Sequence, residues 1–229
     1  MKRKFQHIAY LLMVAAVITS CGEKKQTSEF PDWAWADFQR PEGINPIVSP
    51  DTTTVFYCPM RQDSVAWESS DTFNPAATIY DGKVVVLYRA EDNSAVGIGS
   101  RTSRLGYAYS DVCLHFNRMS VPVFYPADDN QKELEWPGGC EDPRVAVTDD
   151  GLYVMLYTQW NRKQARLAVA TSRDLQIWEK YGPAFAKAYG GRFFDEFSKS
   201  ASIVTKLVDG KQVIAKIDGK YWMYWGEKF

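Results

Sequence analysis

The amino-acid sequence predicts an all-β fold, and within that class the N-terminal portion of a β-propeller. The first observation behind this prediction is a recurring Asp-Gly turn signal that is followed by a run of β-forming residues. The turns end at Gly82, Gly151 and Gly219, which lie 69 and 68 residues apart in the 229-residue chain. The runs that we expect to be equivalent strands of successive blades are residues 84–88, 152–157 and 221–225.

The second observation is another strand-like phrase between these turns. Residues 105–111 (LGYAYSD) resemble residues 167–174 (LAVATSRD), and each phrase is followed by a Pro-containing return, at Pro122 and at Pro183. Two such phrases in a period of nearly 70 residues favour four-stranded blades with long loops. A two-sheet sandwich also has short, regularly spaced strands, and it is the alternative.

The third copy of the repeat starts at Asp218, and the sequence ends at Phe229 before the second phrase returns. Propellers close with at least four blades. We therefore expect this chain to be the N-terminal part of a longer protein, in which residues 44–70 are a further source of strands.

The composition is that of a globular protein, with 45% hydrophobic and 24% charged residues. The formal net charge is −1, which gives no reason to expect a nucleic-acid or anionic-membrane partner. Aromatic residues make up 14% of the chain. This supply suits all-β cores, and it also suits sugar binding, because aromatic faces pack against the C–H faces of pyranose rings.

The N-terminus has the three parts of a bacterial lipoprotein signal. A basic start at residues 2–4 precedes an apolar run over residues 8–18, which is too short to span a membrane as a mature helix. The small residues Thr19 and Ser20 then lead into Cys21, as in a lipobox. An ordinary secretory signal with a chance cysteine is the alternative.

These features divide the chain into a signal peptide (1–20), a lipid-anchored tether (21–43) and the first part of a propeller domain (44–229). The tether is polar and contains Pro31 and Pro41. We expect an exported bacterial lipoprotein of the cell envelope, periplasmic or on the outer face of the outer membrane. Its contact with the membrane would be made through the lipid alone.

The sequence gives no signal for a metal or a cofactor. Cys58, Cys113 and Cys140 lack metal-ligand spacing and could form one disulfide at most. His7 lies in the signal, and we expect His115 to be a surface or strand residue, so the two histidines do not make a zinc site. No glycine-rich phosphate loop or catalytic Ser/His set is present.

The densest group of chemically active residues is Gly138-Gly139-Cys140-Glu141-Asp142-Pro143-Arg144. The glycines permit close backbone approach, and Pro143 is expected to restrain Asp142 toward an extended backbone. Beside the basic Arg144, one carboxylate could be held ionised while the other is kept protonated by burial. A structural turn whose acids cap backbone amides is the alternative.

Two further polar groups lie at strand ends, where propeller loops converge on a central pocket. Asn74 opens one predicted strand, and Arg89 and Asp92 directly follow the apolar strand at residues 84–88. A solvated surface ion pair is the alternative for the last two.

Taken in order, the phrases FNPAA, VVLYRAED, YAYSD, PVFYP, GGCEDPR, YVMLYTQWN, LAVATSRDLQIW and YWMYWGE resemble glycoside hydrolase family 130. The resemblance covers residues 72–227. It implies a five-bladed β-propeller that acts on β-mannosides, either as an inverting phosphorylase or as a hydrolase. It also implies that Asp142 is the general acid, that Asn74, Arg89 and Asp92 hold the sugar in the −1 subsite, and that Glu141 and Arg144 shape the pocket.

Phosphorylases and hydrolases of this family differ in the nucleophile. A site that binds phosphate as the nucleophile needs cationic groups and hydrogen-bond donors. Phosphorylases of this family commonly carry a His-Arg pair after a strand like residues 219–224, and this chain has Trp225 and Gly226 there. Glu227 follows, and a carboxylate at this point could act as the general base on water. Lys199 occupies a position that is basic in the phosphorylases too, so the change is partial.

The resemblance therefore favours an inverting, exo-acting β-mannosidase, with β-1,2 linkages as the expected substrate, Asp142 as acid and Glu227 as base. The alternatives are an inverting β-mannoside phosphorylase that releases mannose 1-phosphate and a non-catalytic glycan-binding lipoprotein that retains the pocket.

The lipobox makes a chemical prediction. The Cys21→Ala variant should lose its membrane anchor, because the thiol that would carry the diacylglycerol is absent. Labelling of cells with a clickable fatty acid measures this directly. Equal labelling of the wild type and the variant would exclude the lipoprotein interpretation.

Overall fold

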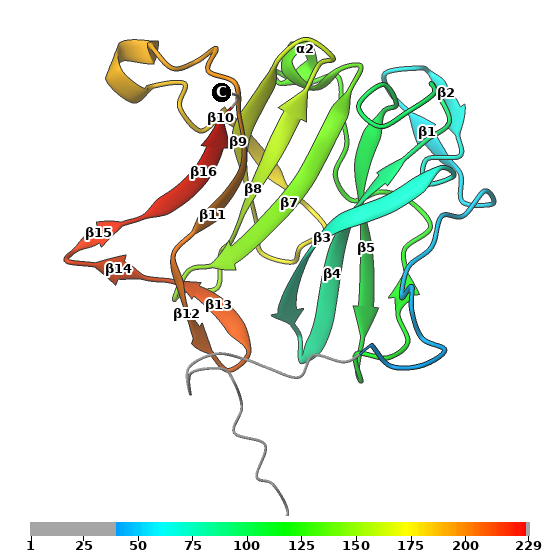
Figure 1. Cartoon of the computed structure of the whole chain (residues 1–229), viewed down its shortest axis with the longest axis horizontal. Helices are drawn as coiled ribbons and strands as arrows, with labels where there is room; N and C mark the ends of the chain where they lie inside the picture. The colour runs from blue at the N-terminus through cyan, green and yellow to red at the C-terminus, as the bar shows by residue number, and fades with distance from the viewer. Residues whose placement is uncertain (1–39, 228–229) are drawn as a thin grey trace, which may run out of the picture. The chain divides into compact units, whose positions relative to one another are not determined.

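The computed structural model describes residues 40–227, and it is built almost entirely from strands (Figure 1). The only helical elements in this part of the chain are the short helix α2 (Lys132–Glu135) and the 3₁₀ turn η1 (Ala188–Gly191). No helix in residues 40–227 combines the length and the apolar character needed to cross a bilayer. The all-β prediction is confirmed.

The strands form repeating units, which we number in chain order. Unit 1 is an antiparallel sheet that runs in the order β3 (Asp71–Tyr80), β4 (Lys83–Glu91), β5 (Ser103–Ser110) and β6 (Asn117–Arg118). Unit 2 repeats this pattern with β7 (Gly139–Val147), β8 (Tyr153–Trp160), β9 (Ala165–Ser172) and β10 (Glu179–Pro183). A single parallel pair, Ser103 opposite Gly139, joins the two units into one continuous sheet.

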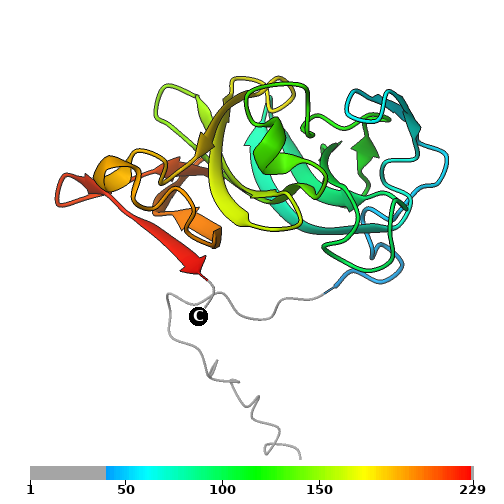
Figure 2. The same cartoon turned by 90° about the horizontal axis from the view of Figure 1, so that it is seen from above.

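Unit 3 consists of β11 (Ser198–Ile203), paired antiparallel with β16 (Met223–Glu227). Between these two strands the chain forms two hairpins, β12 (Thr205–Val208) with β13 (Lys211–Ile214) and β14 (Lys216–Ile217) with β15 (Lys220–Tyr221). Seen from above, the three units follow one another in chain order, from cyan through yellow to red (Figure 2).

The units pack face to face because successive side chains of a strand point to opposite faces. On β8, Met155 and Tyr157 belong to a core shared with unit 1, whereas Leu156 belongs to a core shared with unit 3. A third core lies on the other face of unit 1. There the hairpin of β1 (Phe56–Cys58) and β2 (Asp63–Val65) and the fully buried Trp67 cover strands β4 and β5.

The three runs expected to be equivalent strands lie in β4, in β8 and across β15 and β16, with Trp222 as a break in the last run. Strands β4 and β8 are the second strands of units 1 and 2, paired with β3 and β7, and β16, which holds residues 223–225 of the third run, pairs with β11. Residues 105–111 and 167–174 fall on the third strands, β5 and β9. In residues 40–227 the sheets do not close into a ring, so the closed propeller and its number of blades stay predictions.

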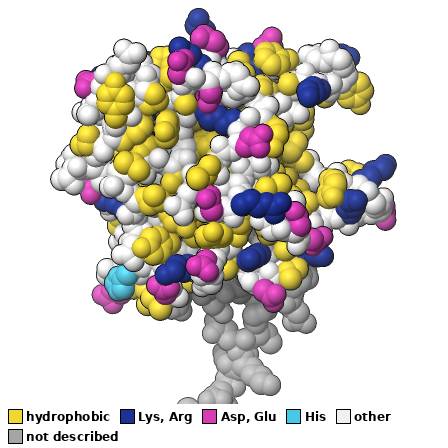
Figure 3. All heavy atoms as spheres, turned by 180° about the vertical axis from the view of Figure 1, so that it is seen from behind, with side chains coloured by type: hydrophobic (Ala, Val, Ile, Leu, Met, Phe, Trp, Pro, Cys, Tyr) yellow, Lys and Arg dark blue, Asp and Glu magenta, His cyan; other side chains and the backbone are white. Residues whose placement is uncertain are grey.

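Other expectations fall partly or wholly outside this region. The signal peptide, Cys21 and most of the tether lie outside the described residues. Cys58 and Cys140 are buried free thiols, Cys113 is an exposed free thiol, and His115 is exposed in the loop before β6. On the face seen in Figure 3, acidic and basic side chains are interspersed, and neither sign forms a continuous patch.

The junction between units 1 and 2 generates a stability prediction. Gly139 has φ +117°, and a Cβ at this position would lie 2.2 Å from the backbone oxygen of Ser103. We expect Gly139→Ala to lower the free energy of unfolding by about 3 kcal/mol, because backbone strain and a backbone clash add. Gly151→Ala is the matched control, since Gly151 also has a positive φ but no atom within 4 Å of the added Cβ, and should cost about 1 kcal/mol. Urea unfolding measures both, and equal losses would contradict the prediction.

Candidate active site

The candidate site begins with an irregularity that the first strand of every unit shares. The regular pairing is interrupted by a register shift between Phe73 and Ala76 on β3 and between Glu141 and Arg144 on β7. A third shift lies between residues 199 and 202 on β11. Each shift contains one non-glycine residue in the left-handed region, namely Asn74 (φ 45°), Asp142 (φ 51°) and Ser200 (φ 56°).

The sequence accounts for two of these bulges. Pro75 and Pro143 have no N–H to donate to the sheet, so regular pairing is interrupted at these prolines. Asn and Asp are the non-glycine residues that tolerate positive φ best. The expectation that Pro143 keeps Asp142 extended is therefore wrong, because the bulge places Asp142 in the left-handed region.

Arg89 lies at the centre of the polar side chains gathered at this point. Its Nη2 donates to Glu141 Oε1 at 2.8 Å, and its Nη1 donates to Asp142 Oδ1 at 3.0 Å. Asn74 Nδ2 donates to the same Asp142 oxygen at 2.8 Å. The guanidinium also lies over the ring of Phe73, 4.5 Å from its centroid. Strands β3, β4 and β7 thus bring together the residues Asn74, Arg89, Glu141 and Asp142.

A second set of partners fixes Arg89 from the other side. Arg89 Nη2 donates to Glu91 Oε1 at 2.6 Å, and Arg89 Nε donates to Ser103 Oγ at 3.0 Å. Ser103 Oγ in turn donates to Glu91 at 3.2 Å. Glu91 is fully buried and Arg89 is 4% exposed, so this pair is held away from water. The paired and hydrogen-bonded geometry is what a buried charge requires.

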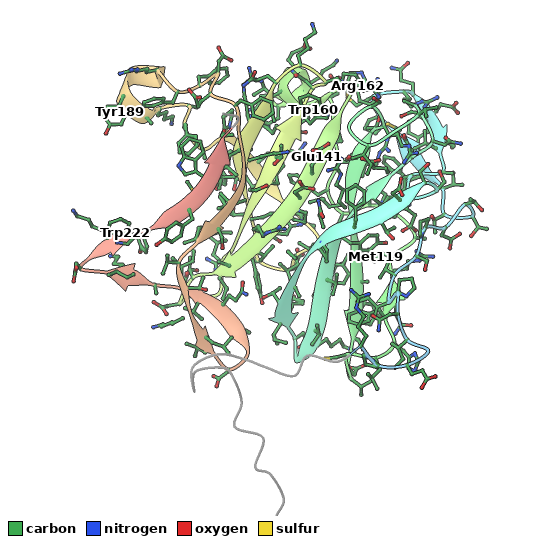
Figure 4. The ribbon with its side chains drawn as sticks, in the orientation of Figure 1. Met119, Glu141, Trp160, Arg162, Tyr189 and Trp222 are labelled. Carbon is green, nitrogen blue, oxygen red and sulfur yellow. The ribbon has the colours of Figure 1, made fainter. Side chains whose placement is uncertain are left out.

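The charges in this cluster do not balance. Arg89 contacts three carboxylates, and the second arginine near them, Arg101, lies 3.5 Å from Glu91 but also pairs with Asp71. Burial raises the pKa of Glu141 to about 7. The positive charge of Arg89 opposes this rise, and the negative charges of Asp142 and Glu91 add to it. Lys199, which is exposed at the start of β11, opposes it as well, so its charge acts on the same site. Glu141 is placed on β7 in Figure 4.

Two residues implied by the resemblance occupy other surroundings. Asp92 is 1% exposed and accepts hydrogen bonds from Arg104 at 2.8 Å and from the backbone of Ser94 at 3.0 Å, so its carboxylate has almost no accessible surface. Arg144 is exposed, and its Nη1 donates to the carbonyl of Pro143. The cation in contact with both carboxylates is therefore Arg89, because the bulge at Asp142 leaves Arg144 beyond the cluster.

Glu227 ends β16, where its backbone lies opposite Ser198, and the neighbouring Gly226 lies opposite Lys199. The Glu227 side chain lies outside the described part of the structure. The strand pairing nevertheless brings the end of β16 beside β11, the strand that carries Lys199.

The sequence reasoning missed Glu91 and Ser103. The signal for Glu91 was available, because residues two apart on a strand share a face, and Arg89 and Glu91 are so spaced on β4. The resemblance implies the adjacent Asp92 instead. Ser103 carries no such signal, since its role comes from lying opposite Glu91 in the pairing of β4 with β5.

A buried network lies on the other side of β7 from this cluster. Cys140 is fully buried, and burial raises the pKa of its thiol. Near it, Lys180 pairs with the buried Glu135 at 2.5 Å, and Tyr157 donates to the same carboxylate at 2.8 Å. These contacts attach helix α2, in the loop that leads to Gly138 and Gly139, to β8 and β10.

The comparison with known families agrees with this geometry. Residues 39–228 match the profile of glycoside hydrolase family 130, whose description is beta-1,4-mannooligosaccharide phosphorylase. The chain belongs to this family of carbohydrate-active proteins.

The chain is also similar to individual proteins of this kind. The chain is similar to a solved structure of a candidate glycosidase from Bacteroides thetaiotaomicron VPI-5482, with 98% identity and a TM-score of 0.85 over 88% of this chain and 58% of that one. It is also similar, with 69% identity and a TM-score of 0.84, to a structure described by the words "The GH130 family of mannoside phosphorylases contains glycoside hydrolases that target beta-1,2 mannosidic linkages in Candida mannan". That match covers 86% of this chain and 55% of the other.

A third relative is the 1,2-beta-oligomannan phosphorylase of Thermoanaerobacter sp. (strain X514), which is 35% identical over 152 residues. The match covers 65% of this chain and 46% of the relative. The chain thus spans about half the length of the relatives it matches.

The charge imbalance around Arg89 predicts a titration. A carboxyl signal with a midpoint at about pH 7 should belong to Glu141, and it should be absent from Glu141→Gln. Glu91→Gln should lower the midpoint, because it removes one of the negative charges that raise it. NMR of ¹³C-labelled glutamate carboxyls measures both, and a Glu141 midpoint between 4 and 5 would contradict the prediction.

The raised pKa of Glu141 also determines how its contribution to the free energy of unfolding changes with pH. The pKa of Glu141 is higher in the folded protein than its ordinary value of 4.5, so the unfolded chain releases this proton first as the pH rises. The contribution of Glu141 to stability therefore falls between about pH 4.5 and pH 7 and is constant above that range.

Proposed function

We propose that the protein is an inverting, exo-acting β-mannosidase that cleaves β-1,2-mannosidic linkages with water as the nucleophile. The observation that carries this proposal is the contact of Arg89 and Asn74 with Asp142, next to Glu141, in a chain of glycoside hydrolase family 130. Hydrolysis of a glycoside with inversion uses two carboxyl groups. One protonates the leaving-group oxygen, and the other deprotonates the attacking water.

Asp142 is the proposed general acid. The hydrogen bonds that it accepts from described residues all reach Oδ1, which leaves Oδ2 to carry the transferred proton. Its side chain is 12% exposed, so it is accessible to a substrate, whereas Glu91 is not. Arg89 and Asn74 hold the carboxyl group in one orientation, and orientation is what proton transfer to a fixed glycosidic oxygen requires.

Glu227 is the proposed general base. The sequence has Trp225 and Gly226 where a phosphorylase of this family would carry its cationic pair, and a carboxylate follows. Replacing cations by an anion disfavours a phosphate nucleophile and supplies a group that can deprotonate water. The pairing of Gly226 with Lys199 supports a position for this strand end beside the cluster.

Phosphorolysis is the second candidate activity. The positive charge of Lys199 acts on Glu141, and a cation at this edge of the site would also attract phosphate. The similarity to an oligomannan phosphorylase favours the same activity.

The proposal includes the complete fold and the location of the protein. Units 1 to 3 would be successive blades of a five-bladed propeller that the rest of the protein closes around the cluster. Cys21 would anchor the protein in the cell envelope by its lipid. Its substrates would therefore be glycans outside the cytoplasm.

The two carboxylates are tested in the full-length protein. Asp142→Asn and Glu227→Gln should each lower turnover by about a hundredfold or more, because each removes one proton-transfer step. An aryl mannoside with a good leaving group should partly rescue only Asp142→Asn, since it needs little protonation. Azide should rescue only Glu227→Gln and give an α-mannosyl azide, because it needs no base. Near wild-type turnover by Glu227→Gln in phosphate-free buffer would exclude Glu227 as the base.

The nucleophile is tested with β-1,2- and β-1,4-mannobiose, with and without phosphate. We expect mannose from β-1,2-mannobiose at a rate that does not depend on phosphate. Mannose 1-phosphate that forms only with phosphate would establish the phosphorylase. Binding of either disaccharide without cleavage would establish a non-catalytic glycan-binding protein.

A further inference from the structure

A second, aromatic pocket lies beside the end of β16, outside the cluster around Arg89. Its cavity of about 430 Å³ is lined by Phe185, Ala188, Tyr189, Phe193, Glu196 and Trp225. The rings pack in pairs. The centroids of Phe185 and Trp225 lie 4.7 Å apart, and Tyr189 and Phe193 pack edge to face with their centroids 5.6 Å apart. Four of its six lining residues are therefore aromatic, and a single carboxylate faces the same cavity.

This combination fits a sugar ring better than a purely apolar ligand. Aromatic faces pack against the C–H faces of a pyranose, and the volume is that of an ordinary small-molecule site. The Glu196 carboxylate can accept hydrogen bonds from sugar hydroxyls. An apolar ligand would bury that carboxylate without a donor, which is unfavourable.

The loop that carries these residues is anchored at its base and irregular at its tip. Arg166 and Gln164 donate to residues 194 and 195, which fixes the base to β9 and to the loop before it. At the tip, Tyr189 adopts a left-handed conformation (φ 49°), which is rare for a bulky residue, and it is 87% exposed. Backbone outliers of this kind are found at ligand sites. Figure 4 shows Tyr189 on this loop, which projects beyond the strands.

The residues that line the pocket are neighbours, in sequence and in strand pairing, of residues at the edge of the candidate active site. Glu196 lines the pocket, and three residues later Lys199 exerts its charge on Glu141. On β16, Trp225 lines the pocket, and the next residue, Gly226, pairs with Lys199. A chain of linked sugars with one end at Asp142 would therefore extend past Lys199 toward the aromatic residues.

We propose that this aromatic pocket is a distal subsite that binds a hexopyranosyl unit of the glycan, on the reducing-end side of the bond cleaved at Asp142. This proposal rests on the proposed function for the cleaved bond, and it adds a preference for longer glycans. Tyr189 and Phe193 supply the packing surface, and Glu196 accepts hydroxyl protons.

The test compares short and long substrates in the full-length protein. Tyr189→Ala should lower kcat/KM for β-1,2-mannotetraose by about tenfold, because it removes one aromatic contact with the sugar. It should leave β-1,2-mannobiose and an aryl mannoside unchanged. Glu196→Gln, which keeps the shape of the side chain, should show the same selectivity with a smaller loss. Tyr57→Ala is the matched control, since Tyr57 is a strand tyrosine, 63% exposed, outside the pocket.

Calorimetric titration of mannotetraose into Asp142→Asn, with and without Tyr189→Ala, measures binding separately from turnover. Equal losses on short and long substrates, or no loss on either, would overturn the subsite while leaving the mannosidase intact. A wild-type protein that neither cleaves nor binds any mannoside would overturn both proposals. A Tyr189→Ala variant that changes the sedimentation mass without changing glycan binding would identify the pocket as a contact between protein molecules and overturn the subsite.

Discussion

The junction of the sheets and the candidate site both depend on the ion pairs and hydrogen bonds of the buried Arg89 guanidinium. It reaches Glu91 on its own strand, Ser103 on β5, and Glu141 and Asp142 on β7. Strands β4 and β5 belong to unit 1 and β7 belongs to unit 2, so this one side chain links the two units next to the parallel pair of Ser103 and Gly139. An arginine that is 4% exposed needs such partners, because an unpaired charge of this kind would be strongly destabilising. The partners that a buried arginine needs thus stabilise the junction, and they also concentrate carboxylates there.

The excess of carboxylates gives the site its chemical character. Arg89 and Arg101 together face four carboxylates, Glu91, Glu141, Asp142 and Asp71, and Glu91 is sealed from water. The excess negative charge is therefore relieved at Glu141, whose pKa rises to about 7. A carboxyl group with this pKa changes its protonation near neutral pH.

The bulges explain how a repetitive sheet presents different chemistry in each unit. Every first strand interrupts its pairing at an equivalent place, and the residue in the left-handed region is Asn74, Asp142 or Ser200. A bulge re-aims a side chain without disturbing the rest of the strand. Substitution at one bulge can therefore change the donor or acceptor offered to a ligand, while the alternating residues behind it keep the cores between the units intact.

The amino-acid sequence was sufficient to predict most of the local strands and four members of the cluster, Asn74, Arg89, Glu141 and Asp142. Asp-Gly turns followed by β-forming runs predicted β4, β8 and the β15–β16 segment, because turn chemistry acts within a few residues. The bulges at Asn74 and Asp142 were not predicted, and the extended backbone expected at Asp142 was wrong. Which cation pairs with which carboxylate depends on the tertiary structure. Arg89 rather than Arg144 contacts Asp142, and Ser103 joins the cluster from β5. These choices depend on strand register, on the bulge at Asp142 and on burial, which bring together residues more than fifty positions apart.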